Sequence, residues 1–161
     1  MTIIDVANKE HWATYQQLVL EYADSLPFDL DFQGFHAELA RIEKMYGPPG
    51  GCALLAMAGK VAVGCVGLRR LEEGVCEMKR MFVRPGHRGL GAGGALTSAV
   101  LERAAALGYR RMRLDTMESM KSARGLYMAH GFYPIPPYCH NPLAGAVFME
   151  ARVPSNGPNR S

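Results

Sequence analysis

The segment VRPGHRGLGAGG, residues 83–94, joins basic side chains to a run of glycines. Arg84, His87 and Arg88 come first, and glycine then occupies positions 89, 91, 93 and 94. Glycine lets the backbone approach a ligand closely, and the amides at the start of a helix attract anions. Guanidinium and imidazole groups beside them would add contacts to phosphate oxygens. The segment therefore predicts a site for a phosphate-bearing molecule. The alternative is a tight turn that only packs a helix against a strand.

Two nucleotide-binding patterns compete for this segment. Gly89, Gly91 and Gly94 fit G-x-G-x-x-G, and Asp115 follows Gly94 by 21 residues, where a dinucleotide-binding fold places its ribose-binding acid. However, the basic loop 84–88 separates the end of the strand from the first of these glycines, and little chain follows Asp115 to complete a doubly wound sheet. No Walker A lysine follows the glycines, which excludes a P-loop nucleotidase by pattern.

The elements that must position this segment follow from the periodicity of apolar residues. Residues 2–7 predict a strand, and two helices are expected after it. The apolar face of the first helix consists of Trp12, Tyr15, Leu18, Val19 and Tyr22, and that of the second, within residues 31–47, of Phe32, Phe35, Leu39 and Ile42. Residues 47–51, GPPGG, end the second helix.

The middle of the chain predicts an antiparallel meander followed by a crossover. Residues 52–71 fold at the Ala58-Gly59-Lys60 turn, and residues 75–83 form the next strand. An alanine- and leucine-rich helix then spans residues 91–107. In RRMRLDT, Met112 and Leu114 point to one face and Arg111, Arg113 and Asp115 to the other, as in a strand. The strands on either side of this helix must therefore be parallel and neighbouring.

The last third of the chain predicts a helix at residues 119–130 and a final strand at residues 146–152. The intervening loop, YPIPPYCHNPLAG, is expected to wall a pocket together with the region between the first two helices. We expect residues 1–153 to form one domain and residues 154–161 a flexible tail.

Two segments resemble motifs of the GNAT superfamily of N-acetyltransferases. MFVRPGHRGLGAGGAL is similar to its central cofactor motif, R/Q-x-x-G-x-G/A, which residues 88–93 satisfy. SARGLYMAHGF is similar to its later helix, with Ala123, Tyr127 and the Gly131-Phe132 pair. The resemblance covers residues 52–150 well and the first 50 only as a strand and two helices. It implies an α/β (α+β) fold with a mixed, mostly antiparallel central sheet, helices on both faces and one central parallel βαβ crossover.

The resemblance implies acetyl-CoA as cosubstrate. No metal is expected, because the cysteines form no CxxC pair and the histidines are scattered. The amides of the glycine loop would bind its pyrophosphate, and a splay between the two parallel strands would free backbone groups for its pantetheine arm. The amide of Val83 would donate to the thioester carbonyl. The residues expected to contact acetyl-CoA are Met81, Phe82, Val83, Arg88, Gly89, Leu90, Gly91, Ala92, Gly93, Gly94 and Ala123.

Transfer to an amine needs one group that accepts a proton and one that donates a proton. Tyr127 matches the general acid of the family, because a phenol stays protonated at neutral pH and can donate to the leaving sulfur. Glu77 is the expected base, directly or through water, with Asp115 and Glu118 in reserve. Alternatively, Tyr127 only packs its ring in the core, and Glu77 is only a solvated charge on its strand. Met120 stands where many members carry an asparagine, so a side-chain hydrogen bond to the cofactor arm is missing.

The acceptor is expected to be a small-molecule or peptide amine. Residues 21–32, EYADSLPFDLDF, would give an acidic rim for a cationic amine such as an amino acid, polyamine or aminoglycoside, if the acids do not simply cap helices. A non-catalytic acetyl-CoA sensor and a dinucleotide-dependent oxidoreductase remain alternatives. Homodimers are common in the superfamily the chain resembles.

Composition limits the functions further. With 161 residues, 48% of them hydrophobic, the chain can bury one sizeable core. Its net charge of +3 comes from 18 basic and 15 acidic residues spread along the chain, which argues against nucleic acid as a partner. The cysteines form no CxxC pair, and no apolar run of about 20 residues appears. We therefore expect a reduced, cytoplasmic protein with no membrane partner.

Overall fold

A mixed sheet runs through the molecule in the computed structural model, which describes residues 1–30 and 34–154. The sheet has seven strands in the order β1-β2-β3-β4-β5-β7-β6 among these residues. Only β4 and β5 pair in parallel, and every other neighbouring pair is antiparallel. The strands are β1 Thr2–Asp5, β2 Cys52–Ala58, β3 Val61–Glu72, β4 Val75–Val83, β5 Arg111–Met117, β6 Tyr133–Ile135 and β7 Ala146–Arg152. The expected mixed sheet with one parallel pair is confirmed.

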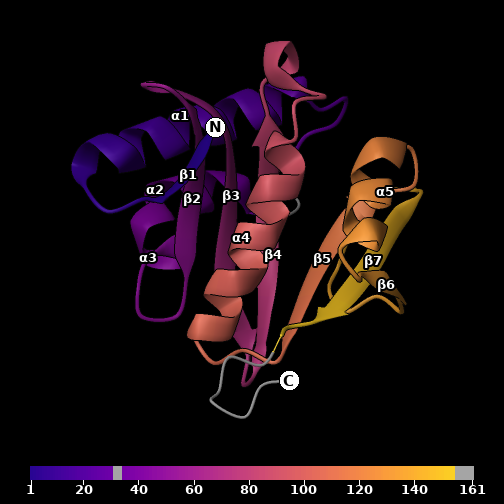
Figure 1. The fold of residues 1–161 in the computed structure, drawn as a ribbon. Helices are drawn as coiled ribbons and strands as arrows, with labels where there is room; N and C mark the ends of the chain where they lie inside the picture. Colours follow the sequence, from indigo (N-terminus) through magenta and orange to yellow (C-terminus); the bar gives the residue numbers. More distant parts are fainter. Residues whose placement is uncertain (31–33, 155–161) are drawn as a thin grey trace.

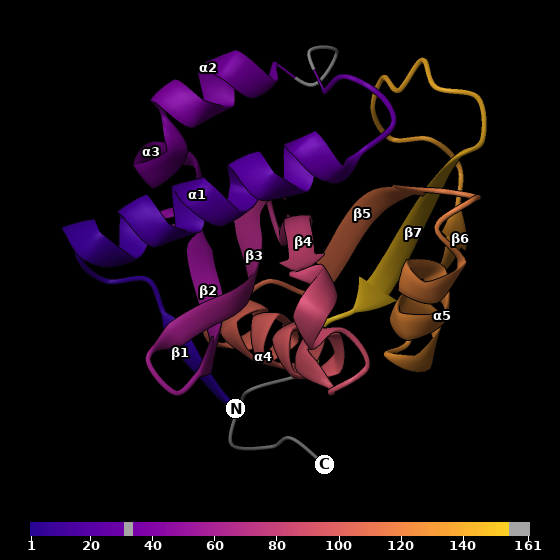
Figure 2. The same ribbon diagram turned by 90° about the horizontal axis from the view of Figure 1, so that it is seen from above.

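Helices cover both faces of this sheet (Figures 1 and 2). The helices α1 (Lys9–Ser25), α2 (Phe35–Ala40) and α3 (Ile42–Tyr46) lie on one face. The crossover helix α4 (Ala92–Ala106) and α5 (Lys121–Ala129) lie on the other. Among the described residues, no helix is long and apolar enough to cross a membrane.

Each face of the sheet has its own apolar core. Leu54, Val66 and Met112 belong to the core under α4, together with most of the buried side chains of that helix. Tyr15 and Leu18 of α1 belong to the second core, beneath α1, α2 and α3. The predicted apolar face of the first helix is thus confirmed, and so is the inward orientation of Met112 on β5.

The second helix was expected to be continuous, and this is wrong. The helix is interrupted at Arg41, whose backbone is not helical (φ −127°, ψ 24°), and the segment forms the two helices α2 and α3. Residues eight positions apart in a continuous helix are separated by about 12 Å along its axis. The break lets the Tyr46 hydroxyl donate to a carboxylate oxygen of Glu38 at 2.9 Å. Phe32, expected on this helix, lies outside the described residues, as do all residues of the expected tail except Pro154.

The expected loop after Phe132 begins with a strand that the sequence did not reveal. β6 pairs antiparallel with β7 at the edge of the sheet, with Pro134 opposite Met149. Proline lacks a backbone donor, so a strand that contains it survives only where one side stays unpaired. The prolines of this segment therefore mark an edge strand as well as a loop.

The strands β4 and β5 separate soon after they meet. They pair only at Val75–Arg111, Cys76–Met112 and Glu77–Arg113. Beyond Glu77, β4 carries a bulge: Lys79 and Phe82 pair with Gly67 and Cys65 of β3, so β4 has one residue more than β3 in this interval. Such a bulge bends and twists its strand, which turns the end of β4 away from β5. The predicted splay is confirmed.

The packing of α1 and α3 on β3 depends on the absence of a side chain at Gly67. A Cβ there would overlap the hydroxyl of Tyr15 and lie 2.8 Å from the ring of Tyr46, and both tyrosines are buried. We expect Gly67→Ala to lower the free energy of unfolding by about 1–3 kcal/mol, because the helices must shift. Gly125→Ala in α5, where a Cβ meets nothing within 4 Å, should raise it by up to about 1 kcal/mol. Urea titration of both variants measures the difference, and equal stabilities would contradict this account.

Candidate active site

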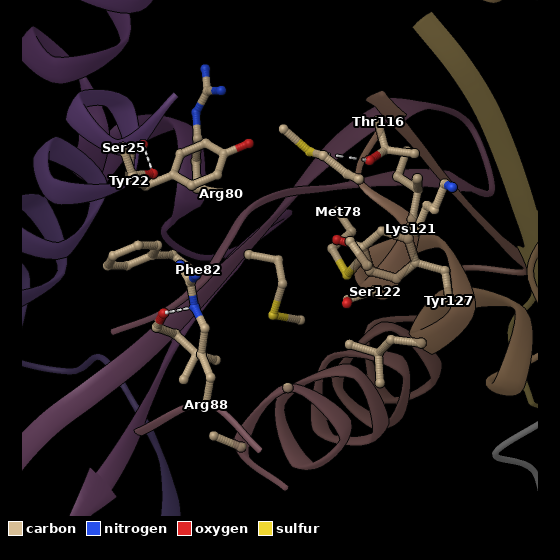
Figure 3. A pocket seen from close by; sticks show the side chains of 18 of the residues that line it. Tyr22, Ser25, Met78, Arg80, Phe82, Arg88, Thr116, Lys121, Ser122 and Tyr127 are labelled. Carbon is tan, nitrogen blue, oxygen red and sulfur yellow. Dashed lines mark hydrogen bonds between the residues drawn. The ribbon is translucent and has the colours of Figure 1, made fainter. Parts of the chain in front are cut away.

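A cavity of about 800 Å³ lies where β4 and β5 have separated. In Figure 3, Tyr22 and Phe82 form one side, and Thr116 and Tyr127 face them across the opening. The glycine loop and the start of α4 line the cavity as well. Every predicted acetyl-CoA contact lines it except Leu90, whose side chain is 68% exposed. The structure therefore brings together the two motifs singled out in the sequence.

Glycine is required in the glycine loop for two different reasons, backbone conformation at some positions and close packing at another. Gly89 (φ 81°) and Gly91 (φ 88°) have left-handed backbone, and a Cβ at either position would meet nothing within 4 Å. Gly91 is the N-cap of α4, and Ala95 donates to its carbonyl at 3.0 Å, so the preceding amides of the first turn have no acceptor within the helix. At Gly93, in contrast, a Cβ would lie 3.0 Å from Leu126 of α5. Gly93 thus allows α5 to approach α4.

Of the basic residues before the glycines, two line the cavity and one forms an ion pair that stabilises the fold. Nδ1 of His87 is buried without a hydrogen-bond partner within the described part of the chain, and His87 lines the cavity. Arg88 also lines the cavity, and its Nε donates to the carbonyl of Val83 at 2.9 Å. Arg84 does not line it. Instead, Nε and Nη2 of Arg84 donate to both carboxylate oxygens of Glu21 at 2.8 and 2.7 Å.

The backbone at the end of β4 is open on the side of the cavity. Arg84 donates its amide to Val63 of β3 at 2.8 Å, so the backbone groups of Val83, one residue earlier, point the other way. The hydrogen bond from Arg88 to the Val83 carbonyl agrees with this orientation. Since pairing with β5 stops at Glu77, the amide of Val83 faces the cavity rather than a strand. A peptide-like chain laid here can pair with β4.

A buried ion pair fixes the bulge of β4. Nε and Nη2 of Arg80 donate to Oε2 and Oε1 of Glu38 at 2.8 and 2.7 Å, and both side chains are 3% exposed. Arg80 has a positive φ of 61° without being glycine. Burial raises the pKa of Glu38, but the hydrogen bonds and the positive charge of Arg80, with smaller effects of Lys79 and Tyr46, together outweigh it, and the pKa is lowered. One feature of the sequence could have indicated this pair: Glu38 lies among the apolar residues Phe35 and Ile42.

Tyr127 of α5 reaches the cavity wall from a packed position. Its side chain is 7% exposed, and its ring lies 5.8 Å from that of Phe132. Burial raises the pKa of Tyr127 above its usual value of about 10, so the phenol keeps its proton at neutral pH. Within the described residues, no hydrogen bond engages its hydroxyl. Tyr127 can therefore donate a proton to a group held in the cavity.

Glu77 is not brought together with Tyr127. It is 1% exposed, does not line the cavity, and occupies the last position at which β4 pairs with β5. Nε of Arg69 donates to one carboxylate oxygen at 2.8 Å, and the hydroxyl of Tyr138 donates to the other at 2.7 Å. Its role as a base stays a prediction. Of the reserve candidates, Asp115 lines the cavity and Glu118 does not.

The walls of the cavity differ from the expected ones. Glu21, Asp24 and Asp29 do not line it, and Asp31 lies outside the described residues. The region between the first two helices lines the cavity as expected, through Tyr22 and Ser25 at the end of α1 and Leu26 and Pro27 after it. The loop between β6 and β7 lies behind the wall, where Asn141 donates to Asp115 at 3.1 Å. Met120, the departure from the family pattern, lines the cavity and accepts a hydrogen bond from Thr116 at 3.7 Å.

Within residues 1–30 and 34–154, no group of three or more histidine, cysteine, aspartate or glutamate side chains could hold a metal ion. The four cysteines are free thiols.

Comparisons with known proteins point to one family. The sequence model of the acetyltransferase (GNAT) family matches residues 9–132. An uncharacterised N-acetyltransferase of Schizosaccharomyces pombe is 40% identical over 141 residues, which are 86% of each chain. A GNAT-family acetyltransferase of Staphylococcus aureus has a TM-score of 0.76 at 27% identity, covering 94% of this chain and 98% of its own. A phosphinothricin acetyltransferase of Sinorhizobium meliloti in complex with AcCoA has a TM-score of 0.68 at 18% identity. The match covers 99% of this chain and 91% of that chain.

The buried pair of Arg80 and Glu38 should make stability depend on pH. Because the pKa of Glu38 is lowered in the folded state, its carboxylate stabilises the fold above its unfolded pKa of about 4.3. This stabilisation is lost as the pH falls through the folded pKa. We expect Glu38→Gln to cost about 3–5 kcal/mol at pH 7, since it leaves the charge of Arg80 buried and unpaired. The difference from wild type should shrink below about pH 4.

Urea unfolding of both proteins from pH 7 to pH 3 measures this difference. Glu43→Gln, on the exposed face of α3, is the matched control and should stay within about 0.5 kcal/mol of wild type. A cost of Glu38→Gln that does not change with pH would contradict the assignment.

Proposed function

Because the chain belongs to the GNAT family of acetyltransferases, we propose that it transfers the acetyl group of acetyl-CoA to the primary amine of a small molecule or peptide. The main support is one cavity that joins an open strand edge, an anion-binding helix start and a buried tyrosine. The Sinorhizobium meliloti acetyltransferase that shares the fold is a complex with AcCoA. Acetyl-CoA supplies an activated thioester, and the chain supplies binding, orientation and proton transfer.

The residues of the cavity fit acetyl-CoA. The amides of the first turn of α4 attract a diphosphate, and the positive φ values of Gly89 and Gly91 leave room for it. Nδ1 of His87, buried without a partner among the described residues, gives this end a further polar contact. The open edge of β4 at Met81 and Val83 can pair with the amides of the pantetheine arm. In this arrangement the amide of Val83 donates to the thioester carbonyl and stabilises the negative charge that develops on its oxygen.

Tyr127 gives its proton to the departing sulfur. The acceptor ammonium carries three protons, of which one stays on the amide nitrogen of the product. The C–N bond forms as the C–S bond breaks, the sulfur takes the proton of Tyr127, and a proton from the acceptor nitrogen restores the phenol. The remaining proton leaves to solvent. Burial favours this role because it keeps Tyr127 protonated until the thiolate forms.

The ammonium must lose a proton before its nitrogen can attack. Glu77, the base expected from the sequence, is separated from the cavity and binds Arg69 and Tyr138, so it would act only through water. A direct contact is open to Asp115, which lines the cavity.

The two alternative functions are less well supported. A dinucleotide-dependent oxidoreductase would need a doubly wound parallel sheet, and this sheet has a single parallel pair among the described residues. A sensor without activity would not need Tyr127. A homodimer and a cytoplasmic location stay predictions.

Replacing Tyr127 with phenylalanine distinguishes an enzyme from a sensor without activity. We expect Tyr127→Phe to lower kcat by about 100-fold or more, because the thiolate loses its proton donor, while acetyl-CoA binding stays within a factor of about 3. Release of CoA thiol in the presence of amine acceptors measures kcat, and isothermal titration measures binding. Tyr133→Phe on β6, away from the cavity, is the matched control.

Unchanged turnover of Tyr127→Phe would rule out the role of Tyr127 as the acid. Titration of the wild type with NAD tests the oxidoreductase alternative. Binding of NAD but not of acetyl-CoA by the wild type would overturn the proposed function.

A further inference from the structure

A second tyrosine, Tyr22, lines the cavity on the side opposite Tyr127. In Figure 3 its ring stands on the α1 side of the opening, and its hydroxyl points into the opening. Within residues 1–30 and 34–154, no hydrogen bond engages this hydroxyl, and its oxygen remains accessible. The wall that faces Tyr127 therefore presents a polar group to a ligand in the cavity.

Two contacts fasten this part of α1 to the end of β4. The rings of Tyr22 and Phe82 pack edge to face, with their centres 6.0 Å apart. One residue earlier, the carboxylate of Glu21 accepts two hydrogen bonds from Arg84, at 2.8 and 2.7 Å. Phe82 and Arg84 are the residues on either side of Val83. The position of Tyr22 is therefore fixed relative to the amide of Val83, which is proposed to bind the thioester carbonyl.

Both tyrosines of the cavity keep their protons at neutral pH. Burial is the main reason why the pKa of Tyr22 lies above its usual value of about 10. After burial, the phenol of Tyr22 contributes most to raising the pKa of Tyr127, as expected of two hydroxyls that share one cavity. The oxygen of a neutral phenol can accept a hydrogen bond. Tyr22 therefore offers a partner to an N–H group without adding a charge to the cavity.

The proposed reaction leaves one side of the thioester to the incoming amine. The carbonyl oxygen faces Val83, and the sulfur faces Tyr127. A nitrogen that attacks directs its lone pair at the carbonyl carbon, so its N–H bonds point away from the thioester, and a desolvated N–H group needs a partner. On the α1 side Ser25 also lines the cavity, but its hydroxyl donates to the carbonyl of Tyr22 at 2.6 Å. The hydroxyl of Tyr22 is therefore the better partner for the amine.

Resting on the proposed acetyl transfer, we propose that Tyr22 binds the acceptor: its hydroxyl oxygen accepts a hydrogen bond from the attacking amine and holds the nitrogen beside the thioester carbon. No proton moves to or from Tyr22. The two tyrosines then act on opposite sides of the reacting carbon, Tyr127 on the leaving sulfur and Tyr22 on the incoming nitrogen. Glu21, expected from the sequence on an acidic rim for the acceptor, instead keeps Tyr22 in place through Arg84.

A matched pair of CoA conjugates tests this contact without knowledge of the natural acceptor. In one, the CoA sulfur is bonded to the α-carbon of N-methylacetamide, which brings an N–H group to the acceptor side of the cavity. In the other, it is bonded to the α-carbon of methyl acetate, which has nearly the same shape but no N–H. Isothermal titration measures both Kd values. We expect the amide to bind the wild type more tightly than the ester, and this preference to fall by about 5-fold in Tyr22→Phe, which lacks the hydrogen bond.

Tyr15→Phe is the matched control for Tyr22→Phe. Tyr15 lies about two turns before Tyr22 on the same helix. Its hydroxyl is buried without a partner among the described residues, and Tyr15 does not line the cavity. This variant should therefore keep the amide preference of the wild type. Because the preference is a ratio measured within one protein, partial unfolding of either variant cannot mimic the result.

Turnover separates the roles of Tyr22 and Tyr127. Release of CoA thiol is followed at saturating acetyl-CoA with tyramine, spermidine, kanamycin, glycine and a tetrapeptide as acceptors. For the fastest of them, Tyr22→Phe should raise KM by about 5-fold and leave kcat within a factor of about 3, whereas Tyr127→Phe lowers kcat. A fall in kcat at unchanged KM would assign Tyr22 to proton transfer and overturn the proposal.

The conjugates also distinguish failure of this proposal from failure of the proposed function. Equal amide preference in Tyr22→Phe and the wild type overturns the role of Tyr22 and leaves acetyl transfer standing. Failure of the wild type to bind acetyl-CoA overturns the proposed function, and the role of Tyr22 with it.

Discussion

The separation of β4 from β5 is the constraint on which the site depends. Because the strands share only the pairs from Val75 to Glu77, the edges beyond them carry backbone groups that no strand satisfies. Unpaired backbone inside a protein is costly unless water or a ligand takes the place of the missing strand. The parallel crossover brings the start of α4 to the same opening. The departure from regular pairing therefore creates the cavity, and the crossover places the free amides of the helix start at its end.

The opening is maintained by strain and charge acting together. A non-glycine residue with positive φ, such as Arg80, costs about 1–3 kcal/mol and persists only where its surroundings enforce it. Here the surroundings are Glu38 and Tyr46, which meet because the helix breaks at Arg41. The irregular helix and the irregular strand thus depend on each other. Replacing either with regular structure would remove the partner of the other.

The sequence revealed what is local and missed what is distant. The glycine loop, the crossover and Tyr127 each follow from short patterns, and they line one cavity. The pairing of Arg84 with Glu21 joins positions 63 residues apart, and only tertiary packing brings them together. The exposed side chain of Leu90 could not be foreseen from a motif that concerns backbone. The β6 strand was missed because the edge position that tolerates its proline is a property of the whole sheet.

Seen from the opening, the sheet is two unequal halves, β1 to β4 and β5 to β7, joined by the short ladder between β4 and β5, and α4 packs on the first half. A ligand that fills the gap touches both halves and acts as a further strap between them. Ligands that bind only the folded state add stability that grows with their concentration, by about 2.7 kcal/mol at 100 times Kd. Occupation of the gap should therefore make the unfolding temperature of this protein depend on the concentration of its ligand.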